Sequence, residues 1–450
     1  MGFKKRTEIT VATGQICGIA ATGLMLGLSA CASYQAAPLR PDALVAPAVT
    51  APLPADPDAL LKVAIDHDPA VAAARASLDA ALAAQKAARN LPALSLTLST
   101  EYSKDADPQH PWLYGAAVGI PVDAGGRRTA RVTAADLTVV KARYALADAI
   151  WASRQRLRQA ESDLYYAKAL AALDRTLSEQ REAYAAALDK RVTGGEDTRA
   201  LAAQAELDAS AARQALRQAE AGAVQARADL ARALDARPDA VDALPEIVPP
   251  VIDVQTAAEL ADKSLYTRTD IASAVADYDS AENDLRGAVA GQYPDFNIAP
   301  GYTWDHGAVK WPLNLTLALP PLDGNRAHIE QAQAARLAAG KTLEDRIKSA
   351  LHDARAAAAQ YRSDRDAFDA VRARDLPLAE TLAAHAERAL KAGESDRTEA
   401  MAAAAALTQT RVAALQAAKT ASDDRLKLED ATRQSADASE LSLLSQEMTK

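Results

Sequence analysis

The sequence predicts a mainly helical protein with a short membrane β segment, written as two copies of one helix–β-hairpin–long-helix unit. Three observations predict this fold class. Apolar residues make up 49% of the 450 residues but aromatic residues only 4%, and alanine, the best helix former, dominates the apolar set. Residues 127–191 contain neither proline nor glycine. Four short segments alternate between apolar and small or polar residues, which is the period of a strand.

The first thirty residues have the pattern of a secretory signal and are left out of the fold. Three basic residues at 4–6 precede an apolar stretch at 16–30. This stretch is short and glycine-rich for a membrane-spanning helix, whereas its length suits a signal peptide. We therefore expect residues 1–30 to be removed from the mature chain.

The signal ends in Leu28-Ser29-Ala30-Cys31, which resembles a bacterial lipobox. We expect cleavage before Cys31 and lipid on its sulfur; a plain signal peptide with an incidental cysteine is the alternative. The mature chain has no second cysteine, which excludes a disulfide framework. Ala32 stands where aspartate retains some bacterial lipoproteins at the inner membrane, so the outer membrane is expected. Residues 31–57, rich in alanine and proline, are predicted to be a tether.

The rest of the chain contains an internal duplication. Four landmarks recur in the same order at offsets of 199 to 202 residues: Asp68-Pro69 and Thr269-Asp270, Leu91 to Leu94 and Tyr293 to Phe296, Ile120 to Asp123 and Pro320 to Asp323, Thr193 to Glu196 and Ala392 to Glu394. The sequence therefore divides into a first repeat at 58–245, a proline-rich seam at 246–255, a second repeat at 256–435 and a C-terminal tail at 436–450.

Each repeat begins with a short helix and ends with a very long one. The short helices are predicted at about 58–90 and 256–290, and the long ones break at a glycine-containing turn and resume to about 235 or 430. Residues 127–191 alone would give about 95 Å of helix. Apolar residues recur at seven-residue spacing in this segment, which is typical of coiled coils. A helix of this length needs neighbours along its whole length.

The four strands are predicted at about 94–102, 112–120, 296–304 and 311–319. Each has about nine residues, the length that a tilted strand needs to cross the hydrocarbon of a bilayer. Each has one apolar face, with residues such as Leu96 and Leu315, and one small or polar face, with residues such as Thr97 and Thr316. We expect the apolar faces to contact lipid.

Aromatic residues gather beside the hairpin turns at one common level. The set includes three of the four tryptophans and consists of Tyr102, Trp112, Tyr114, Tyr302, Trp304 and Trp311. Aromatic girdles mark the interfaces of membrane barrels. The alternative is an amphipathic sheet packed on helices in a soluble domain. In lipid an open sheet edge leaves backbone groups unpaired, and four strands are too few to close around a lumen, so strands would be pooled between subunits.

These segments together resemble the TolC family of outer-membrane efflux proteins, over residues 58–430. The order of elements carries the resemblance, with motifs at the strand entries, the strand exits and the distal turn: Leu91 to Leu94, Ile120 to Arg127, Leu319 to Arg326 and Leu390 to Asp396. Proline ends the strand, glycine permits the sharp turn, and aspartate can cap the following helix. The segment Leu376-Pro377-Leu378-Ala379-Glu380 resembles the cation-efflux branch typified by CzcC.

The resemblance implies a homotrimer with a twelve-stranded barrel in outer-membrane lipid, mounted on a coiled-coil tunnel across the periplasm. It implies a passive channel whose partners are a periplasmic adaptor protein and an inner-membrane pump. The turns at 191–197 and 391–397 would dock the adaptor, with the tip residues Arg191, Gly194, Gly195, Lys391, Gly393 and Ser395. The cargo stays open between cations such as heavy metals and drugs.

The acidic residues that follow the two tip turns are candidates for a gate. A channel that reaches the periplasm has to be closed at rest, and closure at the tip would bring three copies of each residue together. Asp396 and Glu399 follow the second turn, and Asp197 and Glu206 follow the first. A ring of carboxylates would attract cations. The alternative is that these are ordinary solvated acids at helix starts, where the helix dipole favours them.

The sequence indicates neither catalysis nor a cofactor. Its six histidines are not spaced as metal ligands, and Gly125-Gly126-Arg127 lacks the Lys-Ser/Thr of a phosphate-binding loop. A net charge of −9 without a basic stripe argues against nucleic-acid binding. The competing function is that of a lipid-anchored periplasmic coiled-coil scaffold, which would need the long helices but no bilayer-length strands.

Lipidation is tested by Cys31→Ala. We expect the variant to accumulate as an uncleaved precursor that incorporates no labelled palmitate, because the thiol is the acceptor of the lipid. Cys17→Ala is the matched control, since Cys17 lies inside the predicted signal. Normal maturation and labelling of Cys31→Ala would contradict the prediction.

Overall fold

The computed structural model describes residues 34–38, 49, 52–104, 108–123, 125–264 and 268–449. The chain divides into two units, 1–47 and 48–450, and every helix and strand reported below belongs to the second. The predicted signal peptide and Cys31 lie outside the described residues.

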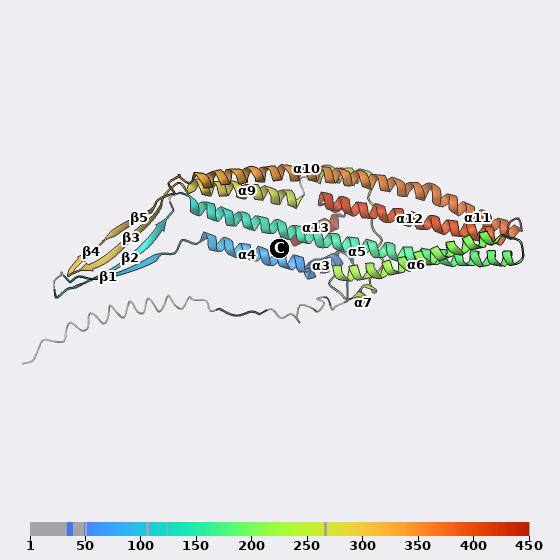
Figure 1. The fold of residues 1–450 in the computed structure, drawn as a ribbon, viewed down its shortest axis with the longest axis horizontal. Helices are drawn as coiled ribbons and strands as arrows, with labels where there is room; N and C mark the ends of the chain where they lie inside the picture. The colour runs from blue at the N-terminus through green and yellow to red at the C-terminus, as the bar shows by residue number, and fades with distance from the viewer. Residues whose placement is uncertain are drawn as a thin grey trace, which may run out of the picture. The chain divides into compact units, whose positions relative to one another are not determined.

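The second unit repeats one order of elements, as Figure 1 shows. The strands lie at one end of the long helices, and the turns α5–α6 and α11–α12 lie at the other. In chain order the elements are α3 Pro57–His67, α4 Pro69–Arg89, β1 Ser95–Tyr102, β2 Trp112–Val122, α5 Arg127–Thr193, α6 Arg199–Ala233, α7 Pro238–Val241, α8 Val254–Lys263, α9 Thr269–Ala290, β3 Asp295–Asp305, β4 Ala308–Lys310, β5 Leu313–Ala318, α10 Arg326–Ala370, a π-helical turn Val371–Asp375, α11 Leu376–Ala392, α12 Arg397–Thr432 and α13 Ala438–Thr449.

The short helix predicted at 58–90 is two helices in the structure. Asp68 ends α3 in an extended conformation, and its side chain accepts a hydrogen bond from the backbone of Ala70, 2.8 Å away, as the N-cap of α4. Pro69 causes the break, because a proline disfavours the helical conformation of the residue before it and fits the first position of a new helix. The helix predicted at 256–290 is likewise divided, into α8 and α9.

The long helix predicted at 127–191 is confirmed, since α5 runs without interruption for 67 residues. It packs along α6, α12, α4 and α9, so its apolar stripe is covered by different helices at different heights. The second long helix differs, because a π-helical turn at Val371–Asp375 separates α10 from α11. Pro377 lies just beyond this turn and has no N–H to donate to the preceding turn, which explains the irregularity.

The strands form one antiparallel sheet in which β1 pairs with β2, β2 with β3, and β3 with both β4 and β5. The fourth predicted strand, 311–319, is shorter in the structure, where it is β5 at Leu313–Ala318, and the short strand β4 at Ala308–Lys310 precedes it without having been predicted. Trp311 and Pro312 lie between them, and the Pro312 carbonyl accepts a hydrogen bond of 2.8 Å from Gly301. A proline cannot donate to a ladder, which ends the pairing there.

The main hydrophobic core lies halfway along α5, where helices from both ends of the chain meet. It contains large apolar side chains of α3, α4, α5 and α6 and one from α13: Leu60, Leu61, Ile65, Val71, Leu146, Ile150, Trp151, Leu157, Leu230, Leu234 and Leu444. Towards the distal turns the helices pack mainly through alanines, such as Ala205 and Ala209. Alanine permits close approach of two helices along their length, as the composition predicted.

The predicted tail, 436–450, folds as α13 and docks on α5 and α3. Three residues on one face of α13, Glu440, Leu444 and Glu447, are buried. The Glu440 carboxylate accepts hydrogen bonds from Arg154, 2.7 Å away, and from Arg158, 2.9 Å away. Arg154 also donates to Glu429 of α12 at 2.6 Å, so this buried network joins the last helix to both repeats.

Glu440→Gln tests this network. Burial acts to raise the pKa of Glu440, but the hydrogen bond and charge of Arg154 and the charge of Arg158 outweigh it and hold the pKa at about 2. We expect the substitution to lower the free energy of unfolding by roughly 3 kcal/mol at neutral pH, because it leaves two arginines short of a partner. The fluorescence of Trp151, whose ring lies 5.0 Å from the Arg154 guanidinium, reports the unfolding.

The pH dependence has a defined sign. Because the folded-state pKa lies below the ordinary value of 4.5, the Glu440 carboxylate stabilises the fold fully above pH 4.5 and progressively less as pH falls towards 2. The difference between wild type and variant should therefore disappear over that window. Leu441→Gln, at an exposed position of the same helix, should stay within about 0.5 kcal/mol of wild type. A difference that persisted at pH 2 would contradict the assignment.

Candidate functional site

The strand registers sort the sheet residues onto two faces. Leu96 lies opposite Val118, Ile120 opposite Ile298, and Ile298 opposite Leu315, so the apolar residues of the strands share one face. Its large members are Leu96, Leu98, Tyr102, Trp112, Tyr114, Val118, Ile120, Val122, Phe296, Ile298, Tyr302, Trp304, Leu313, Leu315 and Leu317. Thr100 is the polar member. The alternation in the sequence thus becomes a continuous apolar surface.

The opposite face carries small and polar side chains at close quarters. Thr97 lies opposite Ala117, and Thr316 opposite Asn297. A Cβ atom placed on Gly115 would lie 2.4 Å from the Ser99 hydroxyl, closer than real Cβ contacts come. Glycine at that position therefore lets neighbouring strands carry polar side chains without a clash.

The six aromatic residues singled out in the sequence lie in ring contact. Trp112 contacts Tyr102 edge-on at 5.1 Å and stacks on Tyr114 at 6.3 Å, and Tyr114 stacks on Trp304 at 6.2 Å. This row crosses β1, β2 and β3 at the end that carries the hairpin loops. Tyr302 and Trp311 form a separate edge-on pair at 5.2 Å.

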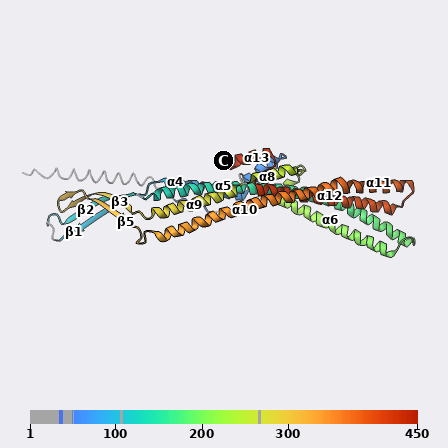
Figure 2. The same ribbon diagram turned by 90° about the horizontal axis from the view of Figure 1, so that it is seen from above.

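The apolar face is open. Leu98 is 72% exposed and Leu313 is 71% exposed. No helix of the described chain covers the sheet, as both Figure 1 and Figure 2 show. The sheet packed on helices in a soluble domain, which was the alternative from sequence, is therefore not what the structure contains. An uncovered apolar surface of this kind marks contact with a membrane or with another protein.

The described helices contain none that is both long enough and apolar enough to cross a membrane. Within the part of the chain that the structure describes, no three His, Cys, Asp or Glu side chains gather as a metal site would require.

The strand exits are held by short-range capping, as the motifs predicted. Asp123 accepts hydrogen bonds from the backbone of Gly125 and Arg127, and Asp323 from that of Asn325 and Ala327. Both long helices follow a residue in the left-handed conformation, Gly126 and Asn325. These turns fix the direction in which the long helices leave the sheet.

The distal turns that the sequence singled out as docking tips lie at the far ends of the helices. Gly194 ends α5 and Gly195 follows with a φ of 80°, while Gly393 ends α11 with a φ of 75°. Such positive φ angles favour glycine. Lys391 is exposed and donates to Glu387 at 2.6 Å, and the hydroxyl of half-buried Ser395 is enclosed without a hydrogen-bond partner among the described residues.

Arg191 joins the two turns, which the sequence pattern did not indicate. Its guanidinium pairs with Asp197 in the first turn and with Asp396 in the second, the latter at 2.5 Å. The partners stand 205 residues apart, so only the packing of α5 against α12 brings them together. The structure therefore gives Arg191 a bridging position at the tip, where its side chain is half-buried.

Asp396, the first gate candidate, is the N-cap of α12. Its carboxylate accepts hydrogen bonds from the backbone of Thr398 at 2.6 Å and of Glu399 at 3.1 Å. The Thr398 hydroxyl, the Glu399 amide and the charge of Arg191 lower the pKa of Asp396, so the carboxylate stays ionised. Glu399, the second candidate, is exposed one turn later. The capping alternative describes the local geometry of Asp396, and its role in a gate stays a prediction.

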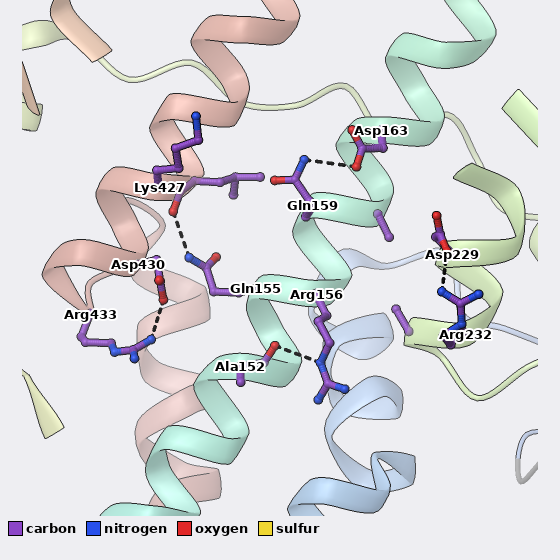
Figure 3. A pocket seen from close by; sticks show the side chains of 13 residues that line it. Ala152, Gln155, Arg156, Gln159, Asp163, Asp229, Arg232, Lys427, Asp430 and Arg433 are labelled. Atoms are coloured by element: carbon purple, nitrogen blue, oxygen red, sulfur yellow. Dashed lines mark hydrogen bonds and ion pairs between the residues drawn. The ribbon is translucent and has the colours of Figure 1, made fainter. Parts of the chain in front are cut away.

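A groove of about 690 Å³ lies along α5, between α6 and α12, and the sequence gave no sign of it. Figure 3 shows three contacts within a helix or its cap: Arg156 with the Ala152 carbonyl, Arg232 with Asp229, and Arg433 with Asp430. The Arg156 guanidinium also pairs with Asp68, and the Trp151 indole of α5 donates to Asp430, 2.9 Å away. Gln155 reaches across to the Leu426 carbonyl at 2.9 Å. The groove is therefore open, runs along α5, and is lined mainly by charged and amide side chains.

Solved channels of the outer membrane share this fold. The outer membrane protein VceC from Vibrio cholerae is 19% identical, with a TM-score of 0.67 over 84% of this chain and 96% of that one. The outer-membrane channel OprN is 18% identical, with a TM-score of 0.70 over 89% and 98%. The MtrE outer membrane channel of Neisseria gonorrhoeae is 19% identical, with a TM-score of 0.65 over 84% and 88%. At these identities the likeness establishes the fold.

None of the curated proteins matches the chain. The family model for outer membrane efflux proteins, however, matches residues 60–236 and 260–432, which lie within the two predicted repeats. This match decides between the two functions that the sequence left open, a channel and a periplasmic scaffold. The chain belongs to the outer membrane efflux protein family, and it is an efflux channel of the outer membrane that extends into the periplasm.

Proposed function

We propose that three copies of this chain form the passive export conduit of a tripartite efflux system, with a continuous wall around one lumen. The observation that carries the proposal is the uncovered sheet, with its continuous apolar face and its aromatic row at one end. In lipid, every backbone group of such a sheet needs a partner. Among the strands that the structure describes, none lies beside the outer edges of β1 and β5. Two neighbouring copies would supply those partners.

The trimer would pool three hairpin pairs into a twelve-stranded barrel, with β4 and β5 together serving as the fourth strand. The apolar face would contact lipid, and the face with Thr97 and Thr316 would line the lumen. Glycines on that second face, such as Gly115, would keep the lumen free of bulky side chains and leave room for the Ser99 hydroxyl. Lipid on Cys31 would anchor the mature chain at the same membrane.

The helices would continue the lumen across the periplasm to an adaptor protein and an inner-membrane pump. The turns that contain Gly194 and Gly393 are the proposed docking sites, and the ion pairs of Arg191 would hold the two turns in a fixed relation. No catalytic step belongs to the conduit, because the pump drives export. Cations and drugs both stay open as cargo.

The gate is proposed at the same end, with Asp396 on the closed aperture. Three copies of one ionised carboxylate around an axis would create a negative ring that concentrates cations. The lowered pKa of Asp396 supports a full charge at the pH of the periplasm. Its pairing with Arg191 offsets part of that charge, so the ring would be weaker than three free carboxylates.

The barrel is tested by arginine substitutions on the two faces. Leu96→Arg and Leu315→Arg should each cost roughly 2–4 kcal/mol of folding free energy near the bilayer midplane, because a charge enters hydrocarbon. Thr97→Arg and Thr316→Arg are the matched controls and should cost much less, since their side chains would reach water. Urea titration of protein folded into lipid vesicles measures the cost. Equal costs on both faces would reject the assigned orientation.

The gate is tested in planar bilayers with Asp396→Asn. Asparagine caps a helix about as well as aspartate, so the substitution removes the charge while keeping the cap. The wild-type channel should be cation-selective and blocked by divalent cations from the periplasmic side. The variant should show a weaker block and a shift towards anions.

Glu394→Gln is the control for the gate, because it removes one exposed carboxylate from the same turn. We expect it to change the block much less than Asp396→Asn. A block that is unchanged in Asp396→Asn would place the constriction elsewhere on the helices. A block reduced equally by both substitutions would indicate the general field of the tip instead of a ring at Asp396.

A further inference from the structure

The junction between the two repeats is held by one arginine at the strand exit. Arg127 is the first residue of α5, and its guanidinium pairs with Asp295 at the start of β3. The same guanidinium donates to the backbone carbonyls of Gly291, 3.3 Å away, and Tyr293, 3.2 Å away. The strand exit of the first repeat, at the start of α5, thus binds the strand entry of the second repeat, which is the segment between α9 and β3.

The exit of the second repeat has the same construction. Arg326 is the first residue of α10, as Arg127 is of α5, and each follows a residue in the left-handed conformation. Each exit is also tied to the entry helix of its own repeat. Arg128 donates to the Arg89 carbonyl at 2.9 Å, and Asn325 donates to the Ala288 carbonyl at 2.7 Å. Arg326 is therefore the structural counterpart of Arg127.

Arg326 has no corresponding partner among the described residues of its own chain. Its side chain is exposed and makes no hydrogen bond or ion pair with the described residues. The strand entry that would correspond to the Arg127 target is 89–93, which precedes β1. In the protomer, β2 and β3 separate β1 from β5, so this entry lies at the opposite edge of the sheet. A neighbouring copy would bring the same entry beside Arg326.

We propose that Arg326 of each protomer grips the β1 entry of the next protomer, as Arg127 grips the β3 entry within the chain. The inference rests on the trimer of the proposed function. Aligned on Pro92 and Pro294, the carbonyls of Arg89 and Leu91 correspond to those of Gly291 and Tyr293. They are the acceptors that the guanidinium would reach on the neighbouring copy.

One difference would make the proposed contact of Arg326 weaker than the contact that Arg127 makes within the chain. Asp295 supplies the carboxylate for Arg127, whereas Ala93 occupies the corresponding position in the first repeat. Arg326 would therefore hold its neighbour through carbonyl oxygens alone. Leu91 at this entry is 78% exposed in the protomer and would be covered by the neighbouring exit.

The missing carboxylate gives the test. Ala93→Asp should create the ion pair that the first junction already has. Because three pairs form in each trimer, we expect the monomer–trimer equilibrium to shift towards trimer by about tenfold. Mass photometry of detergent-solubilised protein over a dilution series at low salt measures the shift. Ala93→Asn, which adds similar bulk without charge, should give no gain.

Arg326→Gln completes the cycle. Alone it should shift the equilibrium towards monomer, and in its presence Ala93→Asp should lose its gain. A gain from Ala93→Asp that persists with Arg326→Gln would overturn the proposed contact. A second measurement does not depend on the monomer–trimer equilibrium constant. In the double variant Leu91→Cys and Arg326→Cys, a short bismaleimide should link separate chains into dimers and trimers. Neither single variant should be linked at this site.

The outcomes separate the two proposals. A wild-type chain that remains monomeric at every concentration in lipid would overturn the trimer, and with it the present contact. A wild-type trimer that shows neither the charge-dependent gain nor linkage between chains at 91 and 326 would overturn the contact alone. Within-chain linkage of Arg127→Cys and Tyr293→Cys, at the junction already formed, is the positive control for the reagent.

Discussion

The structure depends on the need to cover one very long helix. With 67 residues, α5 is far longer than any single partner, and α4, α9, α12 and α6 cover it at successive heights. The largest group of buried side chains lies at its middle, around Ile150 and Leu157, where elements from both ends of the chain converge. Towards the distal turns, single large side chains such as Leu177 and Leu188 pack among alanines. The order helix, hairpin, long helix, written twice, provides these partners at the right places.

Local sequence patterns predicted much of this fold. Contacts between residues far apart in the chain could not be predicted from those patterns. A strand of period two keeps its faces in any register that the hairpin permits, so the apolar face around Leu96 could be predicted. The breaks at Pro69 and Pro312 are also local features. They were missed because the helical pattern around Pro69 and the alternating pattern around Pro312 predicted one continuous element each. The network of Arg154 with Glu429 and Glu440 could not be predicted, because its members stand 275 and 286 residues apart and leave no periodic trace.

The distal turns show the same limit in the candidate site. Glycines at 194, 195 and 393 mark turns in the sequence, and the structure contains turns there. The link from Arg191 to Asp396 depends on how α5 and α12 pack, which residue types alone do not determine. It also changes the meaning of Asp396. A carboxylate that is paired with an arginine attracts a passing cation less strongly than a free carboxylate does. The contribution of Asp396 to a gate would therefore depend on whether its pair with Arg191 is kept when the tip opens.

The duplication explains why the proposed trimer would need two kinds of junction, one within a chain and one between chains. A junction between repeats within one chain forms at the high effective concentration that a covalent connection gives, whereas the equivalent junction between chains depends on protein concentration. The inner junction has the full set of partners for Arg127, including Asp295. In the proposed trimer the outer junction would lack that carboxylate, because Ala93 stands at the corresponding position. Its strength would come mainly from strand pairing and from apolar contacts along β1 and β5. Association would then be favoured most where lipid penalises an open sheet edge, at the membrane itself.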